Sequence, residues 1–301
     1  MKIAVFTKNS TNPAYAAARL GADRAAQRLA AQTLHFVPVK GDDPDEQSEL
    51  IDRALAMRVH AFVLAPVHPR RVNAAIARIN AAGIPLFAFV NPIPAARCVS
   101  YVGADDHALG VEIAQYLFAH LQGRGRVLVV SGPVESVSSI ARVRAFHEAA
   151  GTHPAIAMIG TCVGDYVREQ ARDVVAQWLT ANDGFDACLA ANDVMALGVI
   201  DALRAAGRKA AVAGVNAIPE AVAAIKQGDM LASVDFSAMD MAALATECAV
   251  RHLRGEPVPA EILLPAQIVD RANGHRWDLP FERRPIPTLE EALASPRASR
   301  T

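Results

Sequence analysis

Apolar segments of strand length alternate with alanine-rich segments of helical period along almost the whole chain. This alternation is typical of repeated β–α units, in which each helix returns the chain so that the next strand runs parallel to the last. Several strands are apolar on both faces, as in "AFVLAP" and "RVLVVSG", so helices should cover both sides of each sheet. The pattern predicts an α/β fold.

The alternation comes in two successive sets. At about 150 residues per domain, 301 residues allow two lobes or one large α/β barrel, and two doubly wound lobes fit the pattern better. The first set is expected to have strands at 3–7, 34–39, 61–66 and 85–90 and helices at 13–31, 45–58 and 69–82. The second is expected to have strands at 126–132, 155–162, 187–191 and 210–215 and helices at 106–122, 138–150, 167–180, 193–206 and 218–227.

The last elements come too late to extend the second set. "MLASVDF", a helix at 238–254 and a strand at 262–269 could return to the first lobe. We therefore expect a three-strand hinge, with the run "YVG" at 101–103 as the first crossover and a ligand that closes the lobes. The expected crossings lie near 103–105, 235–237 and 266–270, which gives lobes of 1–104 plus 236–267 and of 105–235 plus 268–301, the latter with a surface tail in which only "LEEALA" is helical.

Composition and charge exclude several classes of protein. A net charge of −1 leaves no basic field to attract a nucleic-acid backbone. The best apolar run, 84–89, is closed by Asn91 and Pro92, well short of the ~18–20 residues of a membrane-spanning helix. We therefore expect neither nucleic-acid binding nor membrane insertion.

The cysteines and the start of the chain carry little signal. Cys98, Cys162, Cys188 and Cys248 form no CxxC pair and have no histidine cluster at ligand spacing, so they are interpreted as core residues and no metal or cofactor is expected. The start "MKIAVFT" shows no signal peptide, as would also be true of a mature exported protein given a new Met.

Polar residues gather directly after the expected strands, and doubly wound folds bind ligands at the carboxyl ends of their strands. Lys8, Asn12 and Tyr15 follow the first strand, and Asn91 follows the fourth. The alternatives are a solvated side chain for Lys8, helix capping for Asn12 and a place in the core for Tyr15.

Two further candidates lie in the second set. Asp193 is expected to cap a helix, which leaves Asn192 at the end of a strand without a structural duty. Arg142, preceded by Ser138 and two neighbouring serines, could donate two hydrogen bonds to a small polar ligand. An exposed ion pair is the alternative for Arg142.

Catalytic motifs are missing from the sequence. It contains no GxSxG, Walker, HExxH or GxGxxG pattern, and "GRGR" at 123–126 precedes a strand. His68 and His107, which follows Asp106, are expected near loop tips at the surface, and neither shows an acid and nucleophile arrangement in the sequence. We therefore expect no catalysis; an α/β enzyme acting on a sugar or nucleotide is the alternative from another class.

These residues give the chain a specific resemblance. Over about residues 3–270 it resembles the type I periplasmic solute-binding proteins, in the ribose- and galactose/glucose-binding branch that serves ABC transporters and chemotaxis. The resemblance rests on "TNPAY", "AGIP", "YVGADDHALG", Arg142 with Phe146, "ANDVMALGVIDAL" and "VAGVNAIPEAVAAIKQGDMLASV". LacI-type regulators share this core but begin with a helix-turn-helix module of about 60 residues, which is missing before a first strand at residue 3.

The resemblance implies a sugar clasped between two lobes. Aromatic rings suit the C–H faces of a sugar, and planar amides and arginine suit its hydroxyls. The implied contacts are Asn12, Tyr15, Asn91, Arg142, Tyr166, Asn192 and Asn216, with Lys8, Ser138 and Phe236 beside them.

The sequence departs from the family pattern at four positions. Ala14 stands where an aromatic residue is usual, Val90 and Asn216 stand where Asp is common, and Phe236 replaces a polar amide. The pocket should therefore be less acidic and more apolar than one for ribose or glucose.

These departures bear on the charge of the ligand. Without the two carboxylates, a buried Arg142 needs either Asp235 turned inward or a carboxylate on the ligand itself. We expect a neutral ligand, because the asparagines supply mixed donors and acceptors suited to hydroxyls. Arg142→Ala is expected to weaken binding by at least ~10-fold and to leave the melting temperature of the unliganded protein nearly unchanged.

The sequence thus predicts the periplasmic solute-binding component of an ABC importer, which binds a monosaccharide or related polyol, delivers it to a permease and is monomeric. The alternatives are a cytoplasmic sugar-sensing core of a LacI-like regulator without its DNA-binding module and a binder of a sugar acid.

Overall fold

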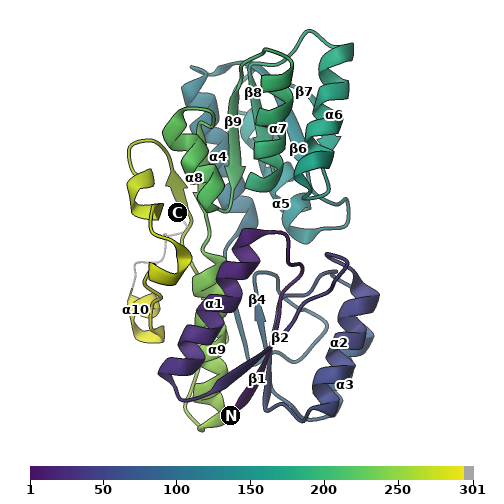
Figure 1. Ribbon diagram of the computed structural model, residues 1–301, viewed down its shortest axis with the longest axis vertical. Helices are drawn as coiled ribbons and strands as arrows, with labels where there is room; N and C mark the ends of the chain where they lie inside the picture. The colour runs from purple at the N-terminus through teal and green to yellow at the C-terminus, as the bar shows by residue number, and fades with distance from the viewer. Residues whose placement is uncertain (295–301) are drawn as a thin grey trace. The chain divides into compact units, whose positions relative to one another are not determined.

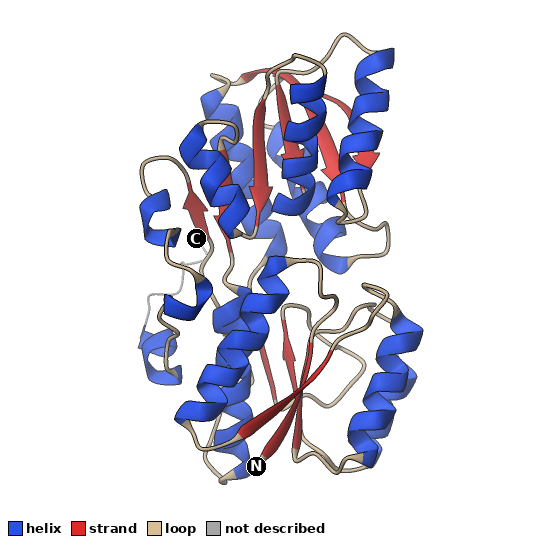
Figure 2. Cartoon of the chain, in the orientation of Figure 1, coloured by secondary structure: helices blue, strands red, loops and turns tan. Residues whose placement is uncertain are grey.

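The computed structural model describes residues 1–294 and divides into two compact units (Figure 1). Among the described residues, unit 1 contains Met1–Ala104, Ser237–Pro265 and 281–294, and unit 2 contains Asp105–Phe236 and Ala266–Pro280. Each unit has one six-stranded sheet with helices on both faces (Figure 2). The predicted α/β class, with two doubly wound lobes, is confirmed.

In unit 1 the strands run in the order β11-β5-β4-β3-β1-β2, and all neighbours are parallel. The strands are β1 (Lys2–Phe6), β2 (Gln32–Phe36), β3 (Ala61–Leu64), β4 (Leu86–Phe89), β5 (Ser100–Gly103) and β11 (Glu261–Leu263). The helices are α1 (Pro13–Arg28), α2 (Pro44–Ala56), α3 (Asn73–Ala81), α9 (Ala238–Leu253), α10 (Leu289–Ala294) and the 3₁₀ turn η2 (Phe281–Arg283).

Unit 2 repeats this topology in the order β12-β10-β9-β8-β6-β7, with β12 antiparallel to β10. The strands are β6 (Arg124–Ser131), β7 (Ala155–Val163), β8 (Ala187–Ala190), β9 (Ala211–Val215), β10 (Ala232–Asp235) and β12 (Gln267–Val269). The helices are α4 (Asp106–His120), α5 (Val137–Ala150), α6 (Arg168–Ala181), α7 (Asp193–Ala205), α8 (Pro219–Gln227) and the 3₁₀ turn η1 (Gly274–Trp277).

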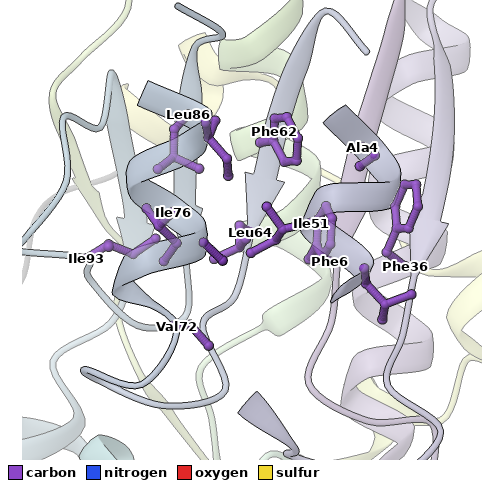
Figure 3. Close-up of a cluster of buried hydrophobic side chains, with 14 of the residues drawn as sticks. Ala4, Phe6, Phe36, Ile51, Phe62, Leu64, Val72, Ile76, Leu86 and Ile93 are labelled. Atoms are coloured by element: carbon purple, nitrogen blue, oxygen red, sulfur yellow. The ribbon is translucent and has the colours of Figure 1, made fainter. Parts of the chain in front are cut away.

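The core of unit 1 is built from the alternating apolar segments. Phe6 stacks on Phe36 and on Phe62, with ring centroids 4.8 and 5.6 Å apart, beneath the apolar faces of α2 and α3 (Figure 3). On the other face, α1 packs against α9. A side chain at Gly21 would place its Cβ 2.2 Å from the carbonyl oxygen of Met239, so this contact requires glycine.

Two details of the predicted order are wrong. The expected strand at 262–269 is two strands: β11 pairs with β5 in unit 1 and β12 with β10 in unit 2. Pro265 lies between them, and proline cannot donate a ladder hydrogen bond. The run "YVG" is part of β5 and not the crossover itself, although the chain does change units after Ala104, within the expected 103–105.

The tail also needs correction. The sequence predicts 268–301 in the second lobe, but residues 281–294 belong to unit 1, which adds a fourth change of unit after Pro280. The buried carboxylate of Glu247 on α9 accepts hydrogen bonds from the backbone of Leu289 (3.2 Å) and from Arg28 of α1 (2.8 Å). These bonds hold α10, the predicted "LEEALA" helix, on unit 1; the predicted tail beyond residue 294 lies outside the described residues.

Candidate functional site

The candidate residues lie at the carboxyl edge of each sheet. In both units the strand order reverses around one strand, between β1 and β3 and between β6 and β8. At such a switch point neighbouring loops diverge to opposite faces and leave a crevice at the ends of the strands. Lys8 follows β1 and Asn192 follows β8, so both sequence-derived sets stand next to a switch point.

In unit 1, Lys8 and Asn91 are joined. The ammonium of Lys8 donates to Oδ1 of Asn91, and both residues are buried, with Lys8 only 7% exposed. The interpretation of Lys8 as a solvated side chain is therefore wrong. The preceding Val90 is buried and has φ of 65°, a conformation that β-branched residues rarely adopt and that is found in strained loops at functional sites.

A neighbouring pair, Asn9 and Asp42, was missed by sequence reasoning. Nδ2 of buried Asn9 donates to Asp42 at 2.7 Å. Burial raises the pKa of the Asp42 carboxyl, while the charge of Lys8 and the bond from Asn9 lower it. Asp42 therefore places a negative charge close to Lys8. The sequence signal was weak, because Asp42 belongs to a loop 33 residues away from Asn9.

Asn12 and Tyr15 begin α1. Asn12 is the N-cap, and its Oδ1 accepts from the backbone N–H of Ala14 at 3.0 Å. The capping interpretation of Asn12 is thus correct for this oxygen. Tyr15 is buried in the first turn of the helix.

In unit 2, the guanidinium of Arg142 is buried, with 3% of the residue exposed. Its Nε and Nη2 both donate to Oδ1 of Asp106, at 2.9 and 2.7 Å, and Nη1 donates to the carbonyl of Ala191 at 2.7 Å. The guanidinium also lies over the ring of Phe236, 5.2 Å from its centroid. The alternative of an exposed ion pair for Arg142 is therefore wrong. Its guanidinium is buried and already donates hydrogen bonds within the protein.

Asp106 answers the question of what balances Arg142. Asp235, one of the two partners expected from the sequence, accepts a 2.7 Å hydrogen bond from Nε1 of Trp277. Asp106 lies in the quoted "YVGADDHALG" segment and begins α4. Sequence reasoning missed it because α4 and α5 are brought together only by the tertiary fold.

The predicted cap of α7 is wrong, because Asn192 and not Asp193 is the capping residue. Asn192 is the N-cap of α7, and its Oδ1 accepts from the backbone N–H of Met195 at 2.9 Å. Asp193 is fully buried and points to the neighbouring strands, where it accepts from Ser233 Oγ (2.7 Å) and the N–H of Ile218 (3.0 Å). The cap uses only Oδ1 of Asn192, so its Nδ2 can donate to another group.

Tyr166 follows β7 with φ of 62°. Its ring lies against Gly132, where a Cβ would come within 2.4 Å of the ring carbons. Its hydroxyl is 3.1 Å from Oγ of Ser136, the N-cap of α5. Ser138, in the first turn of the same helix, is buried.

Asn216 follows β9 with φ of 122°. Its Oδ1 is shielded from solvent and has no hydrogen-bond partner among residues 1–294. A buried acceptor without a donor costs about 1–3 kcal/mol, so this oxygen is suited to receive a hydrogen bond from a bound molecule.

The described part of the chain, residues 1–294, offers neither a metal-binding group nor a membrane-spanning helix. Residues 1–294 contain no group of three or more His, Cys, Asp or Glu side chains arranged to hold a metal ion. None of the helices described in that range has both the length and the apolar character that crossing a bilayer requires. His107 pairs with Glu148, and His68 accepts from the backbone of Arg70 and Arg71.

The chain is similar to known proteins over most of its length. Residues 3–257 match the family model described as periplasmic binding protein domain. A D-apiose import binding protein of Paraburkholderia graminis is 26% identical over 92% of this chain and 89% of its own length. A solute-binding protein structure from Actinobacillus succinogenes with bound D-allose has a TM-score of 0.86 at 25% identity, covering 91% of this chain and 99% of that one. A Mycobacterium smegmatis solute-binding protein with bound glycerol has a TM-score of 0.85 at 26% identity, with coverage of 91% and 96%.

The chain therefore belongs to the periplasmic binding protein domain family, a family of non-catalytic solute-binding proteins. It is a solute-binding protein of the ABC-transporter type that takes sugars and polyols, as predicted.

Proposed function

We propose that this protein binds a neutral monosaccharide or polyol in the periplasm and delivers it to the permease of an ABC importer. The ligand contacts come from Lys8, Asn12, Tyr15 and Asn91 of unit 1 and from Ser138, Arg142, Tyr166, Asn192, Asn216 and Phe236 of unit 2. The relatives named for D-apiose, or found with D-allose or glycerol, support this class of ligand.

The proposal rests on the polar groups at the carboxyl edge of the unit 2 sheet, some of which are hydrogen-bonded within the protein and some of which can bind a ligand. Arg142 has its charge balanced by Asp106, so the bound molecule need not supply a carboxylate. No donor within residues 1–294 reaches Asn216 Oδ1, and a hydroxyl can supply one while accepting a bond itself. Phe236 and Tyr166 offer rings to the C–H faces of such a molecule.

Charge in unit 1 supports the same conclusion. Lys8 is the second cation of the candidate set, and Asp42 and the amide oxygen of Asn91 lie beside it. Both cations therefore have a carboxyl group close by in the protein, which argues against a sugar acid.

The test is a thermal-shift panel of sugars, polyols and uronates on the full chain, followed by calorimetry of the best hit. A ligand at 100 times its Kd raises the free energy of unfolding by about 2.7 kcal/mol. We expect a neutral compound whose Kd changes by roughly twofold or less between low and high salt, because screening acts on charged partners. Tight, salt-sensitive binding of a uronate without binding of its uncharged parent would contradict the neutral ligand, and no hit at all would contradict the proposed function.

A further inference from the structure

A buried hydrogen-bonded network holds the loop that carries Asn216. Ser233 Oγ donates to Asp193 at 2.7 Å and accepts from the N–H of Ala217 at 3.0 Å. Asp193 also accepts from the N–H of Ile218 at 3.0 Å. Asp193 and Ser233 thus bind both backbone N–H groups that follow Asn216, and both side chains are 0% exposed.

The loop needs such restraint because its backbone is strained. Asn216 has φ of 122° and Ala217 has φ of 47°, and each non-glycine residue in such a region costs about 1–3 kcal/mol unless its surroundings hold it there. Gly214 of β9 makes room for the network, since a Cβ at this position would lie 2.4 Å from Oδ1 of Asp193. The close approach indicates that β9, β10 and the start of α7 are fitted around this carboxylate.

We propose that Asp193 and Ser233 are positioning residues for ligand binding: they fix the strained loop so that Asn216 presents its amide to the ligand. This inference rests on the proposed function, because it assumes that Asn216 contacts the bound sugar or polyol. Neither residue touches the ligand in this scheme. Their effect passes through the backbone of residues 216–218.

The charge state of Asp193 makes the idea testable. The pKa of Asp193 is raised to about 7, chiefly by burial and to a lesser extent by the charge of Asp235, against the opposing effects of the bonds from Ser233 and Ile218 and of the charge of Arg142. Arg142 is itself paired with Asp106. A proton on Asp193 removes acceptor capacity, so one of its two bonds weakens below neutral pH. One hydrogen bond of about 1 kcal/mol corresponds to roughly fivefold in affinity.

The experiment is calorimetric titration of the full chain with the best neutral compound of the panel at pH 6, 7 and 8. For the wild type, we expect Kd to rise several-fold as the pH falls from 8 to 6. Asp193→Asn should weaken binding roughly tenfold at pH 8 and flatten the pH profile. Ser233→Ala should also weaken binding at pH 8, because the N–H of Ala217 loses its acceptor. The matched control is Asp186→Asn, since Asp186 accepts a backbone bond from Arg126 (2.7 Å) in the same unit; it should bind as the wild type does.

The outcomes separate the two proposals. If the wild type binds no member of the panel, the proposed function fails. If the wild type binds and both variants bind equally tightly with its pH profile, only the positioning role fails. Should Asp193→Asn not fold, Ser233→Ala and the wild-type profile still decide, because a Kd that is constant from pH 6 to pH 8 overturns the role of Asp193.

Discussion

Replacing Arg142 with alanine should cost the unliganded protein much of its stability, contrary to the expectation drawn from the sequence. The substitution removes two bonds to Asp106 and one to the carbonyl of Ala191, and it leaves a carboxylate that is mostly buried, with 15% of its side chain exposed. Breaking a buried ion pair by removing one partner costs about 3–5 kcal/mol, and partial exposure of Asp106 favours the lower end. At about 2–4 °C per kcal/mol for a domain of this size, a loss of about 3 kcal/mol lowers the melting temperature by roughly 6–12 °C.

Differential scanning calorimetry without ligand measures this directly, and a double-mutant cycle isolates the pair. Arg142→Ala, Asp106→Asn and the double variant Asp106→Asn/Arg142→Ala form the set. The double variant should recover part of the loss, because it no longer leaves a buried charge alone. A melting temperature of Arg142→Ala within about 1 °C of the wild type would refute the pairing. Ligand affinity should still fall by at least ~10-fold, because charge-assisted bonds to hydroxyls are lost.

Three further predictions concern single positions. Gly132→Ala would push a Cβ to 2.4 Å from the ring carbons of Tyr166, so calorimetry should show affinity reduced by roughly fivefold or more as the ring is displaced. Gly21→Ala would meet the carbonyl of Met239 at 2.2 Å and should destabilise unit 1 by about 1–3 kcal/mol in urea unfolding, whereas an unchanged midpoint would contradict the close helix contact. Asp193 has a pKa of about 7 when folded and ~3.9 when unfolded, so the folded chain keeps a proton that the unfolded chain loses and stability falls as pH rises between those values. Asp193→Asn should therefore gain stability relative to the wild type from pH 5 to pH 8, and a difference that is constant with pH would argue against that pKa.

The fold was predictable because its signals are local. Alternating strand and helix periods extend along the chain, and proline after a polar cap marks the start of α1 at Asn12. The strand predicted at 262–269 is too long because its apolar residues continue past Pro265. The break is evident only from the pairing of its two halves with different sheets. The docking of α10 depends on Glu247, a charged residue whose burial no local pattern indicates.

The residue types of the candidate site could be predicted from the sequence, but their hydrogen-bond partners within the protein could not. Lys8, Asn91 and Arg142 could be found from their place after strands or from the family resemblance. Which carboxylate balances Arg142 could not, because Asp106 is 36 residues away in sequence. The cap of α7 shows the same limit. Asn192 and Asp193 are adjacent and both can cap a helix, and only the tertiary fold shows that Asp193 turns to Ser233 and leaves the cap to Asn192.

The return of the tail to unit 1 has a practical consequence for anyone who builds a fluorescent reporter from this protein. β1 starts at Lys2 and α10 ends at Ala294, and both belong to unit 1. Two fluorophores attached at these ends would keep a separation set by the packing of one unit, whatever unit 2 does when sugar is added. A pair that joins the amino end to exposed Lys209 of unit 2 would instead report the predicted movement of one unit against the other.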